Sequence, residues 1–241
     1  MKRNQGINTV QMTNLIFIPA RSGSKRIKNK NLKEFCGSPL IYWTIKSAIE
    51  CNIENPYIMV STDSKEIADE AIAHGVNVPF LRSSEKSQDN SNVVDAILEA
   101  LQHQTLEKLQ VKNIILLQPT SPLRLPGDIE SAFAEFTKQK LNSMISVCEC
   151  SHPPHWSNTL PKNLSMTDFL KYEKQGNLKR KHYRLNGAVY IIKKTALHDF
   201  RSFFVPAKSM AFIMPIERSI DIDTYFDFEL AEFLMKKNVS S

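Results

Sequence analysis

The feature that most constrains this chain is a repeated alternation of short apolar runs with longer stretches of helical periodicity. The first apolar run covers residues 15–18, and comparable runs follow at 57–61 and 143–149. Between such runs, apolar residues recur every three or four positions, as on the buried face of an amphipathic helix. Strands that alternate with helices are typical of parallel sheets, because each helix carries the chain back across the sheet. The pattern predicts an α/β fold with a Rossmann-like, mostly parallel central sheet flanked by helices on both faces.

The predicted elements follow one another through most of the chain. Helices are expected at 38–50, 64–74, 92–104, 128–140 and 225–237. Strands are expected at 15–18, 57–61, 76–81, 113–118, 143–149, 187–192 and 210–216. In the second helix, Ser64 is a candidate N-cap and Gly75 stands just past the end. Short β–α units of this kind argue against an all-β fold or a helix bundle.

Two segments fall outside this alternation. Residues 1–13 are mostly polar and are predicted to be a disordered tail, so the folded domain is expected to span 14–241. Residues 151–182 are rich in Pro, Asn, Lys and Ser and show no sustained period. A long irregular stretch inside a compact domain usually has a function, forms an interface or is disordered. We expect it to leave the sheet as an arm that contacts another subunit.

Composition limits the partners and the setting of the protein. The net charge of +6 and the pI near 9.1 favour anionic partners, without deciding between nucleic acid and small phosphates. The 4 cysteines show no disulfide framework, which predicts a reducing, cytoplasmic location. No apolar run is long enough to cross a bilayer and no signal peptide is evident, so neither a membrane nor secretion is expected.

The first apolar run ends at Pro19 in a loop of small residues and cations. The cations of this basic loop are Arg21, Lys25, Arg26, Lys28 and Lys30. Such loops between a strand and a helix commonly bind phosphates in α/β proteins. Neither GxxxxGK(S/T) nor GxGxxG is present, so the loop is not that of a P-loop NTPase or a dinucleotide-binding protein. The remaining interpretations are a polyphosphate site and a solvated basic loop.

A second polar segment follows the apolar run at 113–118. It reads Gln118-Pro-Thr-Ser-Pro-Leu-Arg124, so it is expected at the carboxyl edge of the sheet, where open α/β folds bind ligands. The amide of Gln118 and the hydroxyls of Thr120 and Ser121 are able to contact a base or a sugar. The segment is equally consistent with an ordinary proline-rich loop.

Two carboxylates lie close together in Ser219-Ile-Asp-Ile-Asp-Thr224. In an extended chain Asp221 and Asp223 point to the same side, with Cα atoms roughly 7 Å apart. Such a pair suits Mg²⁺, which takes few protein oxygens and completes its octahedron with water and phosphate. Thr224 and Asp227 also resemble a capping box, so a helix start is the alternative, and the two interpretations are compatible.

A third polar segment leads into the run at 187–192. It reads Tyr183-Arg-Leu-Asn-Gly-Ala-Val-Tyr190, and Arg184 and Asn186 alternate toward one side of it. An arginine at this place is able to grip a carboxylate bidentately. A surface arginine beside a strand is common, so this segment alone is weak evidence.

Two rival hypotheses have less support. A zinc site would use four residues that fall close together: Cys148, Cys150, His152 and His155. Zinc ligands usually come as two separated pairs, and the two cysteines fit a buried strand better. The basic run at 179–181 has no aromatic-interleaved groove beside it, so nucleic acid is not an expected partner.

Four motifs, in their order along the chain, resemble those of the CMP-sialic acid synthetases. They are IPARSGSKRIKNKN, LLQPTSPLR, YRLNGAVYI and SIDIDTYFDFELAE, and the resemblance covers about residues 15–234. This family, the acylneuraminate cytidylyltransferases, is related to the Kdo cytidylyltransferases. The resemblance implies a fold like that of nucleotide-diphospho-sugar transferases, and a homodimer with dimer contacts from the inserted segment 151–182. It also implies transfer of CMP from CTP to a nonulosonic acid, with Mg²⁺ and release of pyrophosphate, to supply activated sugar for surface glycans.

The resemblance also assigns roles to residues by their position. Those of the nucleotide site are Arg21, Ser24, Lys25, Lys30, Asn31, Arg82 and Asp89, with Arg21 and Lys30 also catalytic. Those of the sugar-acid site are Gln118, Thr120, Ser121, Arg184 and Asn186. Asp221 and Asp223 match the metal-binding pair and are catalytic as well.

Three alternatives remain open from the sequence. A related cytidylyltransferase would act on a Kdo-type octulosonic acid, and a non-catalytic protein would bind CTP or a sugar nucleotide without releasing pyrophosphate. A binder of single-stranded nucleic acid would show steep salt dependence. The paired aspartates argue against this last class, because they would repel phosphate unless a metal is bound. The sequence does not distinguish sialic, legionaminic and pseudaminic acids.

Overall fold

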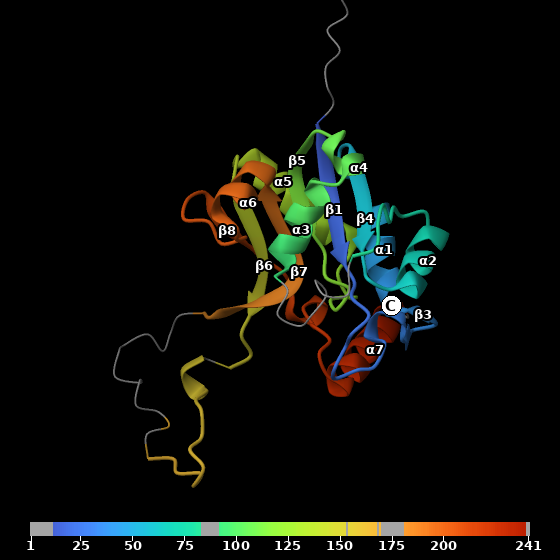
Figure 1. Ribbon diagram of the computed structural model, residues 1–241. Helices are drawn as coiled ribbons and strands as arrows, with labels where there is room; N and C mark the ends of the chain where they lie inside the picture. Colours follow the sequence, from blue (N-terminus) through green and yellow to red (C-terminus); the bar gives the residue numbers. More distant parts are fainter. Residues whose placement is uncertain (1–11, 83–91, 153, 168, 170–180, 240–241) are drawn as a thin grey trace, which may run out of the picture.

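The computed structural model describes residues 12–82, 92–152, 154–167, 169 and 181–239 (Figure 1). Its centre is a six-stranded sheet in the order β4-β1-β5-β7-β6-β8. The strands are β1 (Thr13–Pro19), β4 (Pro56–Ser61), β5 (Val111–Leu116), β6 (Ser143–Glu149), β7 (Tyr183–Lys193) and β8 (Ser209–Ile213). A separate hairpin is formed by β2 (Glu34–Phe35) and β3 (Ser38–Pro39).

The predicted mostly parallel sheet is confirmed, with one reversed strand. β1 lies parallel to β4 on one side and to β5 on the other, and β6 lies parallel to β8. β7 is antiparallel to both of its neighbours, β5 and β6. The segment 151–182 joins β6 to β7, and its described residues contain one short 3₁₀ helix (Pro154–Trp156) and no crossover helix, which is compatible with antiparallel pairing.

Helices cover both faces of the sheet, as the sequence pattern predicts. The α-helices are α1 (Leu40–Glu50), α2 (Lys65–Ala73), α3 (Val93–Leu101), α4 (Gln104–Glu107), α5 (Pro126–Lys138), α6 (Lys194–Phe200) and α7 (Tyr225–Val239). Short 3₁₀ helices are η1 (Lys30–Leu32), η3 (Pro154–Trp156) and η4 (Ile216–Arg218). Ile16 and Ile18 pack in one apolar cluster with α1 and α5, whereas Leu15 and Phe17 pack in another with α3 and α6. β1 is therefore buried on both faces, which explains its unbroken apolar sequence.

Several boundaries differ from the sequence prediction. The helix predicted at 92–104 is divided into α3 and α4, because the His103 ring accepts a hydrogen bond from the Thr105 N–H and caps α4. Residues 76–81 contribute two isolated bridges, at Asn77 and Leu81, in place of a strand. β7 begins earlier than predicted, and α6 and the β2–β3 hairpin have no counterpart in the prediction. These boundaries depend on capping and pairing contacts that periodicity does not show.

A third apolar cluster joins segments that are far apart in the sequence. Its buried members are Ile27, Phe35, Leu40, Leu123, Ile222, Phe228 and Ala231. Ile27 belongs to the basic loop, Ile222 stands between the two aspartates, and Phe228 lies on α7. The rings of Phe35 and Phe228 meet edge-on, with centroids 5.3 Å apart. This set, called the loop cluster below, holds the segment after β1 against the last helix.

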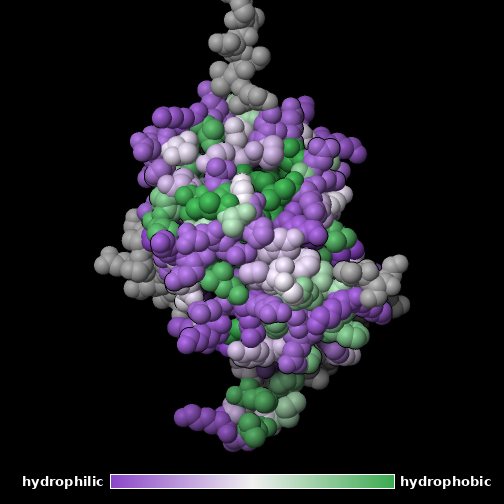
Figure 2. All heavy atoms as spheres, turned by 90° about the vertical axis from the view of Figure 1, so that its right-hand side faces the viewer, coloured by the Kyte–Doolittle hydropathy of each residue, from purple (hydrophilic) through white to green (hydrophobic). Residues whose placement is uncertain are grey.

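The segment after β6 extends away from the body of the protein (Figure 1). Its exposed apolar side chains are Trp156, Leu160, Leu164 and Met166. Figure 2 shows hydrophobic side chains on the part that projects below the body. A role in dimerisation stays a prediction, as does the tail at 1–13, most of which lies outside the described residues. Within the described residues, every helix is too short or too polar to cross a membrane.

A buried arginine ties the loop after β5 to its neighbours. The Arg124 side chain donates hydrogen bonds to the Ala188 carbonyl at 2.7 Å and to the Thr44 hydroxyl at 2.9 Å. A longer contact of 3.4 Å reaches the Gln118 carbonyl. Burial lowers the pKa of the guanidinium to about 9, so the group stays charged near neutral pH. One cation therefore fixes α1, β7 and the loop after β5 relative to one another.

We expect Arg124→Met to lower the free energy of unfolding by about 1–3 kcal/mol, because buried acceptors lose their donor. Urea denaturation followed by circular dichroism measures the change. Arg201→Met is the matched control, since Arg201 is exposed and pairs with Asp95 at the surface, where losing an ion pair costs about 0–1 kcal/mol. Equal stability of the two variants would contradict the role given to Arg124.

Candidate active site

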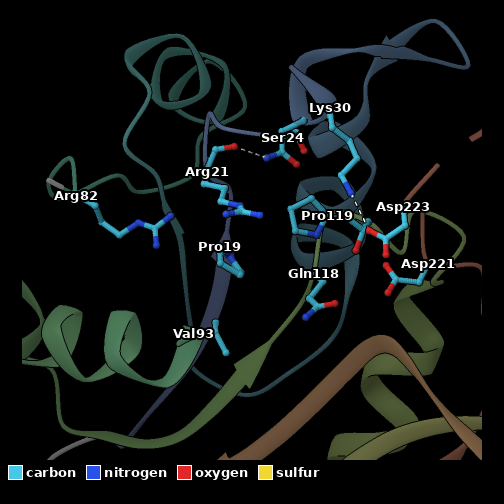
Figure 3. A pocket seen from close by; sticks show the side chains of 12 residues that line it. Pro19, Arg21, Ser24, Lys30, Arg82, Val93, Gln118, Pro119, Asp221 and Asp223 are labelled. Carbon is cyan, nitrogen blue, oxygen red and sulfur yellow. Dashed lines mark hydrogen bonds and ion pairs between the residues drawn. The ribbon is translucent and has the colours of Figure 1, made fainter. Parts of the chain in front are cut away.

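A cavity of about 340 Å³ opens at the carboxyl ends of β1 and β5 (Figure 3). Its lining residues are Pro19, Arg21, Ser24, Lys30, Asn31, Arg82, Val93, Gln118, Pro119, Thr120, Asp221 and Asp223. They come from the end of β1, the basic loop, the segment after α2, the start of α3, the loop after β5 and the turn before α7. The carboxyl edge of a parallel sheet is the usual ligand site of open α/β folds, as the sequence predicts for this protein.

The basic loop is held in place by its own polar residues. The Asn31 amide donates a hydrogen bond to the Arg21 carbonyl at 2.9 Å. The backbone N–H and the hydroxyl of Ser22 both donate to the Asp63 carboxylate, at 2.8 and 2.9 Å. Asn29 takes a left-handed conformation at φ 52°, where the loop turns into η1. The cations of the loop therefore project from a fixed backbone.

Lys30 joins the basic loop to the turn before α7. Its ammonium group donates a hydrogen bond to the Ile222 carbonyl at 2.6 Å and lies 3.5 Å from the Asp223 carboxylate. Only 12% of the Lys30 side chain is exposed. The two segments are 192 residues apart in the sequence, yet this contact places positive and negative groups side by side.

The two aspartates differ in their surroundings. Ile222 is buried between them, and its N–H donates to the Thr120 carbonyl at 2.8 Å, which anchors the turn to the loop after β5. Burial raises the pKa of Asp221, and the nearby Asp223 adds to that rise. A hydrogen bond from Thr120 acts in the opposite direction on Asp221. The Asp223 side chain is 59% exposed.

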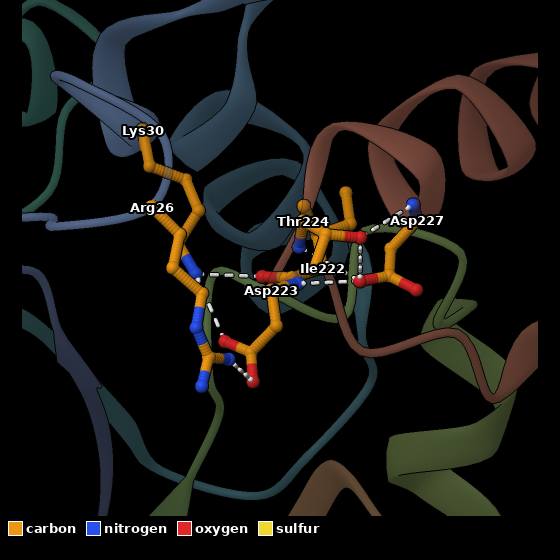
Figure 4. Close-up of polar contacts among 6 residues, drawn as sticks. All are labelled: Arg26, Lys30, Ile222, Asp223, Thr224 and Asp227. Atoms are coloured by element: carbon orange, nitrogen blue, oxygen red, sulfur yellow. Dashed lines mark hydrogen bonds and ion pairs between the residues drawn. The ribbon is translucent and has the colours of Figure 1, made fainter.

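The predicted capping box is present at the start of α7 (Figure 4). The Asp227 carboxylate accepts hydrogen bonds from the N–H groups of Asp223 and Thr224, at 3.1 and 2.7 Å. The Asp227 N–H in turn donates to the Thr224 hydroxyl at 3.3 Å. The cap uses the backbone of Asp223 and leaves its carboxylate directed to the cavity, so capping and metal binding are compatible.

Arg82 faces the aspartates from the opposite side of the cavity (Figure 3). The residue is 9% exposed, and its Nε has no hydrogen-bond partner among the described residues. Burial lowers the pKa of the guanidinium, whereas the charges of Asp63 and Glu99 raise it. Arg82 lines the cavity, so its guanidinium is suited to an anionic or carbonyl-bearing ligand.

A bulge of β7 at residues 186–189 lies beside Gln118. Across from it, Ser146 alone faces the stretch 186–189, because pairing slips between Ile145 and Val147. The Asn186 side chain fills the bulge: its carbonyl accepts from the Ser146 hydroxyl at 2.6 Å, and its amide donates to the Ser219 hydroxyl at 2.8 Å. Asn186 is therefore fully buried and is not among the residues that line this cavity.

Gly187 stands at the closest approach of this bulge to the site. It has φ +73°, and a Cβ there would lie 2.8 Å from Oε1 of Gln118. The same Cβ would lie 3.3 Å from both the Asp221 carboxylate and the Ser121 hydroxyl. Any larger residue would therefore push side chains of the site aside.

The remaining predicted residues lie around this cavity. Lys25 lines an adjoining space together with Arg26. Ser121 is fully buried, and Arg184, whose positive charge lowers the pKa of Asp221, donates to the Ser219 carbonyl at 3.2 Å. Asp89 lies outside the described residues. Sequence reasoning did not single out Asp63 or Gly187, although a glycine after an asparagine is a common sign of an unusual backbone.

The rival hypotheses gain no support. Cys148 is fully buried on β6, and the described residues contain no group of three or more His, Cys, Asp or Glu arranged for a metal. All four cysteines are free. Of the basic run at 179–181, only Lys181 is described, and it pairs with Glu149 at 2.8 Å.

Comparison with known proteins identifies the family of this chain. The family described as Cytidylyltransferase matches residues 15–236. CMP-N,N'-diacetyllegionaminic acid synthase of Legionella pneumophila is 36% identical over 229 residues, which cover 93% of this chain and 97% of the relative. Pseudaminic acid cytidylyltransferase of Campylobacter jejuni is 31% identical over 232 residues, which cover 95% of this chain and 99% of the relative.

A solved structure gives independent support for the fold. CMP:2-keto-3-deoxy-manno-octonic acid synthetase, complexed with CTP, superposes with a TM-score of 0.71 at 17% identity. The superposition covers 94% of this chain and 99% of that chain, and at such low identity it bears on the fold alone. Together, the match over residues 15–236 and the full-length relatives show that this chain belongs to the cytidylyltransferase family.

Proposed function

We propose that this protein transfers CMP from CTP to the anomeric hydroxyl of a nonulosonic acid and releases pyrophosphate. The observation that carries the proposal is the meeting of cationic and acidic groups in one cavity, through Lys30, Ile222 and Asp223. A nucleoside triphosphate with a divalent cation needs both kinds of group side by side. The names of the two relatives support the transferred group and the class of sugar acid.

The basic loop is suited to hold the triphosphate. Arg21, Ser24 and Lys30 line the cavity, and Lys25 lines the space beside it. In the reaction, the sugar's hydroxyl oxygen bonds to the α-phosphorus, and the bond from that phosphorus to the oxygen shared with the β-phosphate breaks. Pyrophosphate leaves with the electron pair, and the hydroxyl proton passes to solvent. Cations already fixed beside the leaving group stabilise its charge without having to reorganise.

The nucleoside part of CTP is expected between Arg82 and Asn31. Both residues line the cavity, and the Arg82 guanidinium supplies a positive charge there. Asn31 is buried, and its amide holds Arg21, so it also orients the basic loop. These two residues would fix the nucleotide while the phosphates extend toward Lys30.

Asp221 and Asp223 are suited to hold Mg²⁺. Both line the cavity, and two carboxylates are what this ion usually takes from a protein when phosphate oxygens and water supply its other ligands. When bound, Mg²⁺ would neutralise phosphate charge and lower the pKa of the attacking hydroxyl. The chain's own part is to keep the two carboxylates in place, through the Ile222–Thr120 hydrogen bond and the cap on α7.

The sugar acid is expected beside Gln118 and Thr120, on the side of Asp221. Arg184 makes two hydrogen bonds to backbone carbonyls, and its remaining N–H groups are suited to the sugar's carboxylate. Ser121 and Asn186 would act from behind by holding the β7 bulge: the Ser121 hydroxyl donates to the Asn186 backbone carbonyl at 3.3 Å, and the Asn186 side chain accepts from Ser146. We further propose that the exposed arm after β6 pairs two copies of the chain in a homodimer that works in the reducing cytoplasm, consistent with the free cysteines.

We expect the purified protein to release pyrophosphate from CTP and Mg²⁺ with at least one nonulosonic acid. The panel contains N,N'-diacetyllegionaminic, pseudaminic and N-acetylneuraminic acids, with Kdo as an octulosonic acid. UTP and ATP test the base, and EDTA should stop the reaction until Mg²⁺ is restored. A reaction with Kdo alone would change the substrate class. No release with any acid, by protein shown to be folded, would refute catalysis.

Asp223→Asn is expected to lower kcat/KM by about 10²-fold or more, because the proposed Mg²⁺ site loses one of its two carboxylates. Pyrophosphate release gives the rate, and circular dichroism checks the fold. Asp199→Asn makes the same chemical change at an exposed residue on α6 and should leave the rate unchanged. Full activity of Asp223→Asn would rule out a metal role for this carboxylate.

Gly187→Ala is expected to lower kcat by about 10²-fold, since the added methyl group displaces Gln118 and Asp221 from their positions. Gly127→Ala is the matched control, because Gly127 lies on α5 with no atom within 4 Å of the added methyl group. The control should keep its activity and gain about 0.5–1 kcal/mol of stability in the helix. Equal rates for the two variants would show that the bulge does not position the site.

A further inference from the structure

Both oxygens of the Asp223 carboxylate lie close to cations of the basic loop (Figure 4). Oδ2 lies 3.0 Å from Nη1 of Arg26, and Oδ1 lies 3.5 Å from the Lys30 ammonium. The functions derived above use Asp223 and Lys30, but they give no role to Arg26. Arg26 is thus a cation at the place where a divalent ion would approach this carboxylate.

The two cations are held very differently. Lys30 is only 12% exposed and is fixed by its short bond to the Ile222 carbonyl. The Arg26 side chain is 66% exposed, while the next residue, Ile27, is buried in the loop cluster. The backbone at Arg26 is therefore anchored, and its long side chain remains free to change its rotamer.

Arg26 also borders the space assigned to the phosphates. It lines the adjoining cavity together with Arg21, Ser24, Lys25, Lys30 and Asp223. From this anchored backbone, the guanidinium of Arg26 is able to reach two kinds of anion: the Asp223 carboxylate and a phosphate oxygen of a bound nucleotide. Only the first is present before a nucleotide binds.

We propose that Arg26 is a counter-cation of Asp223. Before the nucleotide binds, its guanidinium competes with the divalent ion for this carboxylate, and when metal and nucleotide bind together it turns to the phosphates. The inference rests on the proposed function of the same site. Because Arg26 leaves the Asp223 carboxylate as it pairs with a phosphate, nucleotide binding strengthens metal binding. By thermodynamic reciprocity, the metal strengthens nucleotide binding to the same extent. The protein therefore binds the metal more weakly before the nucleotide binds than after it.

The test compares Arg26→Gln with Lys28→Gln. Both changes remove one positive charge from the basic loop, but the described structure shows an ion pair to Asp223 only for Arg26 and Lys30. Mn²⁺ alone is titrated into each protein, and the free ion is measured by electron paramagnetic resonance. CTP binding is then measured by calorimetry with Mn²⁺ present and no sugar acid, so that no turnover occurs.

Arg26→Gln should lower the Kd for Mn²⁺ alone by about two- to fivefold, as the loss of an exposed competing ion pair allows. The same variant should raise the Kd for CTP in the presence of Mn²⁺. Lys28→Gln should change the Kd for Mn²⁺ less than Arg26→Gln does. The opposite signs for metal and nucleotide are the signature of a counter-cation that exchanges partners.

An unchanged Kd for Mn²⁺ in Arg26→Gln, or an equal change in Lys28→Gln, would overturn the inference. Weaker binding of both metal and nucleotide would overturn it as well, since this result indicates only a structural role. Failure of the proposed function is recognised separately, because it appears in the unchanged protein as a lack of pyrophosphate release with every sugar acid.

Discussion

The contact on which the site depends is the burial of Ile27 and Ile222 in one apolar cluster. Burying two such side chains contributes about 1.5–3 kcal/mol each, more than most surface ion pairs supply. Each isoleucine is flanked by charged residues: Arg26 precedes Ile27, and Asp221 and Asp223 enclose Ile222. Neighbouring side chains of an extended segment point to opposite sides, so burying Ile222 turns both carboxylates toward the cavity. Apolar packing thus keeps two like charges close together.

Polar contacts between distant segments hold the parts of this site together. Asp63 holds the backbone of the basic loop, Lys30 holds the turn before α7, and Asn186 holds the bulge under Gln118. Each of these contacts fixes a backbone rather than a ligand. Side chains that face the cavity are therefore preorganised, which is the condition under which charges stabilise a transition state most effectively.

Much of the fold could be predicted from the sequence, because strands and helices carry local signals. β6 has the predicted bounds, and Ser64 caps α2 as predicted. The reversed β7 could not be predicted in this way, since strand order depends on pairings between distant residues. The same distinction, between local signals and long-range pairing, applies to the residues of the site. Motif resemblance identified most lining residues, whereas the buried place of Asn186 follows from a bulge that only the paired strands define.

The loop cluster joins the segment after β1 to α7, and this has a consequence for how the protein is made. A ribosome produces the basic loop early, but Ile222 and Phe228 emerge only after some two hundred further residues. Until then Ile27 has only Phe35, Leu40 and Leu123 of the loop cluster, and Arg26 and Lys30 lack Asp223 opposite them. The central sheet can assemble during synthesis, while the cavity gains its two aspartates last.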